Sequence, residues 1–288
     1  DTVRNIEPIR ASLIQGNISQ DQKWERQARK NILETYALLS SESMLNKNID
    51  LVIWPEAAIP YLTPRRSLQT SFPVDFLKGQ SYLIYGAATY ATQGRKRNYY
   101  NSAFFSAPNG EHLGAYDKKR LVPFGEYVPF EKWIKGIVPA MAGNFSRGDK
   151  TFVFHHDKFH FSVIICYEVL FPELSIDMVN NGAEFFVNIT NDAWFDVTSG
   201  PFQHAHIGRF RAIETRRSFL RAANTGITYW ITPSGQIFDA TRLFKSTTVI
   251  AKIYPSQEKT FYVHFPWLVP FLMLVIVIYG IFKNRQHG

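Results

Sequence analysis

Short apolar runs alternate with longer amphipathic segments along most of the chain, and this pattern predicts an α/β protein. The apolar runs are rich in Val, Ile and Phe and have the length of buried strands, about four to eight residues. They cover 10–15, 51–54, 81–85, 161–166 and 185–189. Between the first two runs, apolar positions such as Ile32, Tyr36 and Leu39 follow a helical spacing and predict a helix over 24–45.

The remaining pattern adds a hairpin and further alternation. The segment NSAFFSAPNGEHLGAYD (101–117) predicts a hairpin, because a Pro-Asn-Gly turn separates two strand-like arms. We expect a helix opened by Pro172, where proline suits the first helical position, and another over 203–219. Short strands are predicted over 220–224, 228–231 and 236–239. The mixed order of strands and helices favours α/β layers around sheets.

The C-terminal segment 261–282 is apolar on every face. About 20 such residues are enough for a helix to cross a bilayer. Trp267 and Tyr279 lie near its two ends, as interfacial aromatics do, and Pro266 and Pro270 fall where a missing N–H costs little. The alternative is a buried core helix, but a core helix rarely stays apolar all round. We therefore expect one domain over 1–260, a transmembrane helix over 261–282 and a short basic tail over 283–288.

Composition and charge narrow the possible partners. Hydrophobic residues make up 45% of the 288-residue chain, enough to bury a sizeable core. The net charge of +8 is compatible with nucleic acid or with an anionic membrane surface. The basic residues lie in short scattered clusters with no long basic tail, so we expect a membrane partner and no nucleic acid. One cysteine excludes an intrachain disulfide.

That cysteine, Cys166, ends an apolar run and is followed by a Tyr-Glu pair. A strand end that enters a helix gathers backbone N–H groups and favours a thiolate, although an unpaired cysteine can equally be a small buried hydrophobe. In LVIWPEAAIP, Glu56 leaves a buried strand, which is costly without a task or a partner, unless the residue is a helix-start charge. The segment YDKKRLVPFGEYVP supplies Lys118, Lys119 and Glu126, and paired lysines are often plain solvated surface.

Together these segments resemble the nitrilase, or carbon–nitrogen hydrolase, superfamily, whose triad is Glu, Lys and Cys in that chain order. Within it, the sequence is most similar to the apolipoprotein N-acyltransferase family over residues 10–282. The matching stretches are IQGNISQDQKW (14–24), VIWPEAAIP (52–60), YDKKRLVPFGEYVP (116–129), NFSRG (144–148), ICYEVLFPE (165–173), VNITNDAWF (187–195) and GPFQHAHIGRFRAIETRRSFLRAANTGIT (200–228). The resemblance implies a nitrilase-like four-layer αββα sandwich with the transmembrane helix appended. Ala193 and Asp196 stand where the family is expected to have glycine.

The resemblance also implies a role for each candidate residue. Cys166 would be the nucleophile, and Glu56 the general base that takes the proton of a thiol whose ordinary pKa is about 8.5. Lys118 would stabilise the oxyanion, with Lys119 as the alternative. The residues expected to support the site are Glu126, Glu168 and Tyr167, and Trp24 is expected to bind substrate.

The implied reaction is a two-step acyl transfer. Cys166 would take a fatty acyl chain from a membrane phospholipid as a thioester. The α-amine of a diacylglyceryl-cysteine at the N-terminus of an apolipoprotein would then attack that thioester. The family reaction implies no metal or other cofactor. His204 and His206 lie two positions apart on a predicted helix and point to different sides, so we do not expect them to share a metal.

The family's location implies a catalytic domain on the periplasmic side of a bacterial inner membrane, and we expect a monomer. The segment 127–148 is apolar but broken by Pro and Gly, so we expect a mobile arm near the lipid surface. Two other functions stay open: a membrane-anchored amidase or nitrilase of the same superfamily, and a membrane-anchored binding module without catalysis. An intact triad argues against the binding module.

Overall fold

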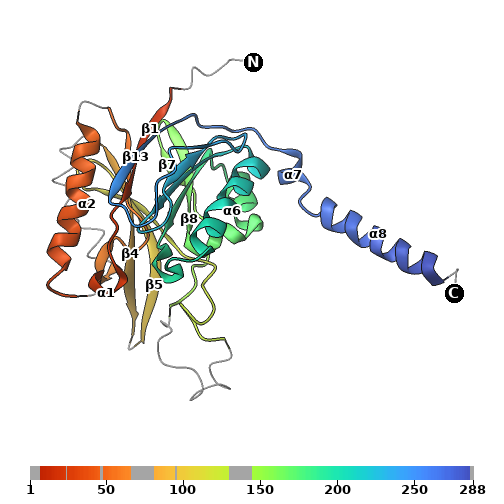
Figure 1. Cartoon of the computed structure of the whole chain (residues 1–288), viewed down its shortest axis with the longest axis horizontal. Coiled ribbons are helices and arrows are strands. Elements are labelled where there is room, and N and C mark those ends of the chain that lie inside the picture. The colour runs from red at the N-terminus through yellow and green to blue at the C-terminus, as the bar shows by residue number, and fades with distance from the viewer. Residues whose placement is uncertain are drawn as a thin grey trace.

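The chain, described here as a computed structural model, forms two β-sheets that face each other, with helices on the outer side of each (Figure 1). The structure describes residues 7–23, 25–45, 48–65, 81–94, 96–129 and 145–285. The order of layers is helix, sheet, sheet, helix, as predicted.

The first sheet is built mainly from the N-terminal half of the chain. Its strand order is β13-β1-β2-β4-β5-β6, and β3 pairs with β4. The strands are β1 (Ile9–Gln15), β2 (Leu51–Ile53), β3 (Ile59–Pro64), β4 (Tyr82–Gln93), β5 (Lys96–Ser106), β6 (His112–Asp117) and β13 (Thr247–Ile253). The predicted hairpin is β5 and β6. Because β2 lies between two parallel neighbours and is buried throughout, its sequence reads as a continuous apolar run.

The second sheet has the order β12-β11-β10-β9-β8-β7. Its strands are β7 (Phe154–His156), β8 (Phe159–Ile165), β9 (Phe185–Thr190), β10 (Ser218–Ala223), β11 (Tyr229–Ile231) and β12 (Ile237–Phe238). The central strand β9 is parallel to both neighbours and fully buried. The carboxyl ends of β8, β9 and β10 therefore meet at one edge of this sheet.

Aromatic side chains fill the space between the sheets. Phe105 of the first sheet meets Phe161 of the second edge-on, with ring centroids 5.0 Å apart. Phe161 also stacks on Phe154 at 4.9 Å. Each fully buried Phe contributes about 1.5–3 kcal/mol of hydrophobic free energy. This core fixes how the two sheets pack against each other, and it therefore fixes the positions of the strand ends that carry the candidate site.

The helices lie mainly on the outer faces of the two sheets, but the last one extends away from the sheets toward the C-terminus (Figure 1). They are α1 (Gln20–Lys23), α2 (Arg29–Met44), α5 (Pro172–Asn180), α6 (Gly200–Thr215), α7 (Phe261–His264) and α8 (Leu268–Arg285), with 3₁₀ helices η2 (Cys166–Leu170) and η3 (Asp192–Phe195). On the first sheet, Tyr36 of α2 stacks on Trp54 with centroids 5.0 Å apart. The predicted helix over 203–219 ends too late, because Arg216 adopts a left-handed backbone and β10 begins at Ser218.

The continuous helix predicted over 261–282 is wrong at its start. α7 ends at His264 and α8 begins at Leu268. Phe265 between them has φ −130° and ψ 59°, because a residue that precedes a proline, here Pro266, is disfavoured from helical backbone. Within the described residues, none of the helices combines the length and the hydropathy that a membrane crossing requires.

Candidate active site

Glu56 lies in a tight turn directly after β2. The turn presses against β4 at Gly86, where an added Cβ would lie only 2.5 Å from the backbone nitrogen of Ala57 and 2.7 Å from the Cα of Glu56. Ala57 itself has a left-handed backbone, with φ 48°. Position 86 therefore needs glycine, because any side chain there would displace Glu56.

The Glu56 carboxylate is buried and each of its oxygens is hydrogen-bonded. Oε1 accepts from the Asn101 side chain at 2.7 Å and from Lys118 Nζ at 3.3 Å. Oε2 accepts the backbone N–H of Asn191 at 2.9 Å. A buried charge is tolerated when it is paired and hydrogen-bonded in this way. These contacts come from both sheets, through Asn101 of β5 and Asn191 after β9, and fix the position of the carboxylate.

Lys118 follows β6 and is almost fully buried. Its Nζ lies 3.3 Å from Glu56 and 2.9 Å from Glu126, and Asn101 also donates to Glu126 at 2.8 Å. Burial alone would lower the pKa of Lys118, but the charges of Glu56 and Glu126 outweigh burial and raise it. Lys118 therefore stays an ammonium. The structure brings Lys118 to Glu56, whereas Lys119 uses its backbone N–H to bond Glu168 at 2.7 Å.

Cys166 is the first residue after β8 and begins η2. Its backbone is left-handed, with φ 49°, a conformation that side-chain-bearing residues adopt at a cost of about 1 kcal/mol or more. The residue is partly exposed, but burial of the thiol and then the Glu56 charge raise its pKa to about 12, against the opposing effects of Lys118 and Thr190. The expectation that the strand end favours a thiolate is therefore not met in the resting protein: Lys118 does lower the pKa of the thiol, but burial and Glu56 outweigh it.

Glu168 ties the lysine loop to the cysteine turn. Its Oε1 accepts from the Tyr116 hydroxyl at 2.7 Å and from the backbone N–H groups of Lys119 and Arg120 at 2.7 and 3.1 Å. Its Oε2 accepts the backbone N–H of Ile165 at 2.9 Å. Burial raises the pKa of Glu168, and these hydrogen bonds oppose the shift. Glu168 thus fixes the backbone on both sides of the site.

The other predicted site residues have different positions. Glu126 is bonded to Lys118, as described above. Tyr167 is partly buried and packs edge-on against Phe171, with centroids 5.2 Å apart. Trp24 lies outside the described residues, and so does 130–144, the central part of the predicted arm.

Sequence reasoning missed three residues of this cluster: Lys23, Asn101 and Asn191. Asn101 begins the buried half of β5, and Asn191 is a polar residue directly after the fully buried β9. A polar residue in or just after a buried strand was the available signal. Their partner, Glu56, is distant in the sequence, so the pairing itself depends on the fold.

Lys23 is almost fully buried at the end of α1, and its Nζ donates to the backbone carbonyl of Glu56 at 3.2 Å. Burial lowers its pKa from the ordinary value of 10.5 to about 8, against the opposing charge of Glu56. Between these two pH values the unfolded chain holds the proton that the folded chain has lost, so stability rises with pH.

We therefore expect Lys23→Met to differ most from the wild type below pH 8, where the folded wild type bears the desolvation of an ammonium. The difference in free energy of unfolding, variant minus wild type, should fall by about 3 kcal/mol as pH rises to 10.5. Chemical denaturation across this pH range measures it, with Lys30→Met as the control because Lys30 is 84% exposed. A difference that does not change with pH would contradict a buried, charged Lys23.

Asp196, which replaces an expected glycine, has φ 46° and ψ −147° at the end of η3. This is a backbone conformation that favours glycine, so the resemblance correctly located a glycine-type turn. Among the described residues, no group of three or more His, Cys, Asp or Glu side chains is placed to hold a metal ion.

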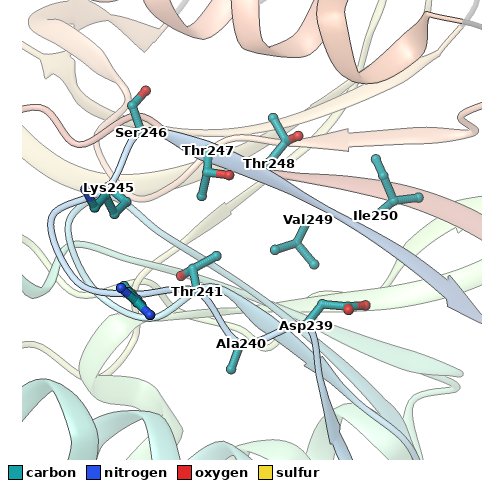
Figure 2. Close-up of a pocket in the computed structure, with 10 residues that line it drawn as sticks. Asp239, Ala240, Thr241, Lys245, Ser246, Thr247, Thr248, Val249 and Ile250 are labelled. Atoms are coloured by element: carbon teal, nitrogen blue, oxygen red, sulfur yellow. The ribbon is translucent and has the colours of Figure 1, made fainter.

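A separate hollow lies between the segment 239–246 and the start of β13 (Figure 2). Its volume is about 630 Å³, and Thr241, Lys245 and Thr247 are among the side chains that line it. None of the residues that line this hollow belongs to the Glu56, Lys118 and Cys166 cluster.

Comparison with known proteins places the chain in a family. The family model described as carbon-nitrogen hydrolase matches residues 10–261. The apolipoprotein N-acyltransferase of Geobacter metallireducens is 36% identical over 260 residues, which cover 88% of this chain and 50% of the relative. That of Pseudomonas syringae pv. tomato is 31% identical over 283 residues, covering 95% and 54%. The chain thus spans about half the length of the curated relatives it matches.

Solved structures show the same fold. Saccharomyces cerevisiae Nit3, a member of the nitrilase superfamily, has a TM-score of 0.66 at 19% identity and covers 86% of this chain and 91% of its own. A carbon-nitrogen hydrolase from Helicobacter pylori G27 has a TM-score of 0.65 at 18% identity, covering 93% and 95%. At these identities the likeness confirms the predicted nitrilase-like α/β fold alone. Since the family model spans most of its length, the chain belongs to the carbon–nitrogen hydrolase family.

Proposed function

We propose that this chain is the catalytic part of an N-acyltransferase that moves a fatty acyl chain from a membrane phospholipid to an apolipoprotein. The acceptor is the N-terminal α-amine of a diacylglyceryl-cysteine. The observation that carries the proposal is the buried cluster in which Lys118 is bonded to Glu56 while the charges of both act on the Cys166 thiol. The likeness to curated apolipoprotein N-acyltransferases supports this substrate class over others in the family.

In the first step, Glu56 takes the thiol proton as Cys166 Sγ attacks the ester carbonyl of the phospholipid. The raised pKa of Cys166 makes this base necessary. The new C–S bond leaves a tetrahedral oxyanion, which the Lys118 ammonium stabilises; one such donor contributes about 3 kcal/mol. The C–O bond then breaks, Glu56 returns the proton to the leaving oxygen, and a lysophospholipid departs from the thioester.

In the second step, the α-amine of the acceptor attacks the thioester carbonyl. Glu56 takes a proton from the attacking nitrogen, and Lys118 again stabilises the oxyanion. The C–S bond breaks as the amide C–N bond forms, and the proton returns to Cys166. Glu126 and Glu168 keep Lys118 and the cysteine turn in place throughout, through the hydrogen bonds described above.

Exposed apolar side chains support a lipid environment for this reaction. Trp194 is 74% exposed and Val197 80% exposed, both close in sequence to Asn191, which holds Glu56. α8 extends away from the two-sheet body (Figure 1). Its exposed apolar side chains include Ile276 and Phe282. We propose that α8 attaches the protein to the bacterial inner membrane, with the catalytic part as a monomer on the periplasmic side and with Trp24 and Tyr167 near the substrate.

The acceptor separates a transferase from an amidase of the same family. Incubation of the detergent-solubilised protein with phosphatidylethanolamine should give an adduct with the mass of one fatty acyl chain. A diacylated lipopeptide with a free α-amine should discharge the adduct, and the same lipopeptide with an acetylated amine should not. A transferase must exclude water from the thioester and position the amine. Rapid discharge by water, or turnover of small soluble amides without a lipid adduct, would identify an amidase instead.

A further inference from the structure

His204 of α6 contacts the backbone of the nucleophile. Its Nε2 lies 3.2 Å from the carbonyl oxygen of Cys166. That carbonyl follows the left-handed φ of Cys166, so the contact falls on the strained peptide of the turn. A carbonyl oxygen can only accept a hydrogen bond, which means that Nε2 carries the hydrogen and donates it.

The other side of the His204 ring is fixed by a buried ion pair. Nδ1 lies 2.8 Å from Asp192 Oδ1, and Asp192 Oδ2 accepts from Arg221 Nη2 at 2.7 Å. All three side chains are at least nine-tenths buried. Burial would raise the pKa of Asp192, but Arg221 and His204 outweigh burial and lower it to about 2. Asp192 is therefore an ionised anchor that sets the orientation of the His204 ring.

Arg221 extends the same network to the residue on the other side of the turn. Its Nη1 donates to Asn188 Oδ1 at 2.5 Å, and Asn188 in turn donates to the carbonyl oxygen of Ile164 at 2.8 Å. The Arg221 guanidinium thus restrains two backbone carbonyls. It reaches the carbonyl of Ile164 through Asn188, and the carbonyl of Cys166 through Asp192 and His204. The turn is restrained on both sides of the strained residue.

The network also reaches the proposed base. Asn191, directly before Asp192, donates its backbone N–H to Glu56 Oε2 at 2.9 Å. The short segment from Thr190 to Asp192 therefore contacts Glu56 directly and Cys166 through His204. Its position sets where the base and the nucleophile lie relative to each other.

We infer that His204, oriented by Asp192 and Arg221, is a positioning residue that holds the Cys166 carbonyl and keeps the thiol aligned with Glu56. The inference deepens the proposed function and rests on Cys166 being its nucleophile. Misalignment of a nucleophile by about 1 Å can cost on the order of a hundredfold in rate, so this single contact has a measurable consequence.

Two substitutions of His204 by amide residues distinguish the contact made by Nε2 from the contact made by Nδ1. His204→Gln places an amide N–H near the position of Nε2 and so can keep the contact with Cys166. His204→Asn places its amide near Nδ1 and can keep only the contact with Asp192. His206→Asn is the matched control, because His206 is exposed on the same helix. Melting temperatures establish that all three variants fold.

The readout is the rate at which iodoacetamide alkylates Cys166, which needs no acyl substrate, followed by the rate of acyl-enzyme formation. We expect His204→Asn to lower both rates about tenfold or more, His204→Gln to retain most of each, and His206→Asn to match the wild type. Equal losses in the Gln and Asn variants, or wild-type rates in His204→Asn, would overturn the inference. If the wild type forms no acyl-enzyme but the alkylation rates of the variants differ as expected, the inference is upheld and the proposed function is contradicted.

Discussion

Replacement of Cys166 by alanine is expected to lower the rate of acyl transfer by at least about 10⁴-fold, because the proposed covalent intermediate can no longer form. Cys166 is the only cysteine of the chain, so no neighbouring thiol can substitute. Iodoacetamide should label the wild type without denaturant and stop its activity, and should leave the alanine variant unlabelled.

The alanine variant should keep the fold, since the change removes a single atom and the turn is held through backbone contacts. Its melting temperature is the control. Activity within tenfold of the wild type in a folded Cys166→Ala protein would show that the acyl chain is carried elsewhere. A wild-type thiol that resists alkylation would instead point to inert packing.

Changes to Glu56 and Lys118 should have the next largest effect. Glu56→Gln should prevent acyl-enzyme formation while lipid binding is retained, since the amide cannot take the thiol proton. Lys118→Met should lower the acylation rate by about 10²–10³-fold through loss of the oxyanion donor. Burst-phase kinetics with phospholipid measure the acylation rate, and a vesicle-binding assay measures lipid binding separately.

Lys119→Met is the matched control for Lys118, because Lys119 contributes its backbone N–H rather than a buried ammonium. Lys118→Met also leaves the buried Glu56 and the partly buried Glu126 without their shared cation, which costs about 3–5 kcal/mol of stability. The rates must therefore be measured below the variant's melting temperature. Similar, severe losses of rate in both lysine variants would mean that the oxyanion donor is wrongly assigned.

The strands that carry the site could be predicted because they are buried on both faces. β2 and β9 each lie between parallel neighbours, so β2 reads as a continuous apolar run, and β9 reads as an apolar run interrupted by Asn188 before its terminal Thr190. β13 was not predicted. It pairs antiparallel with β1, so its position depends on a partner at the other end of the chain.

In the candidate site, too, some residues could be predicted from the sequence, whereas their contacts depend on distant parts of the chain. The resemblance gave Glu56, Lys118 and Cys166, but the contacts that hold them come from distant parts of the sequence. Asn191 is 135 positions from Glu56, and His204 is 38 positions from Cys166. His204 was considered only as a metal ligand and set aside. The pKa of Cys166 was predicted in the wrong direction, because the depth of the thiol depends on how the sheets pack.

The central claim is that Cys166 carries the acyl chain as a thioester. The protein can be incubated with phosphatidylethanolamine whose acyl chains carry a heavy isotope, digested, and mapped by tandem mass spectrometry. We predict the labelled acyl mass on Cys166, in the peptide that includes VIICYEVLFPE, and its removal by neutral hydroxylamine. A hydroxylamine-resistant label on Lys23 or Lys118, or no labelled peptide in a protein that still transfers acyl chains, would contradict it.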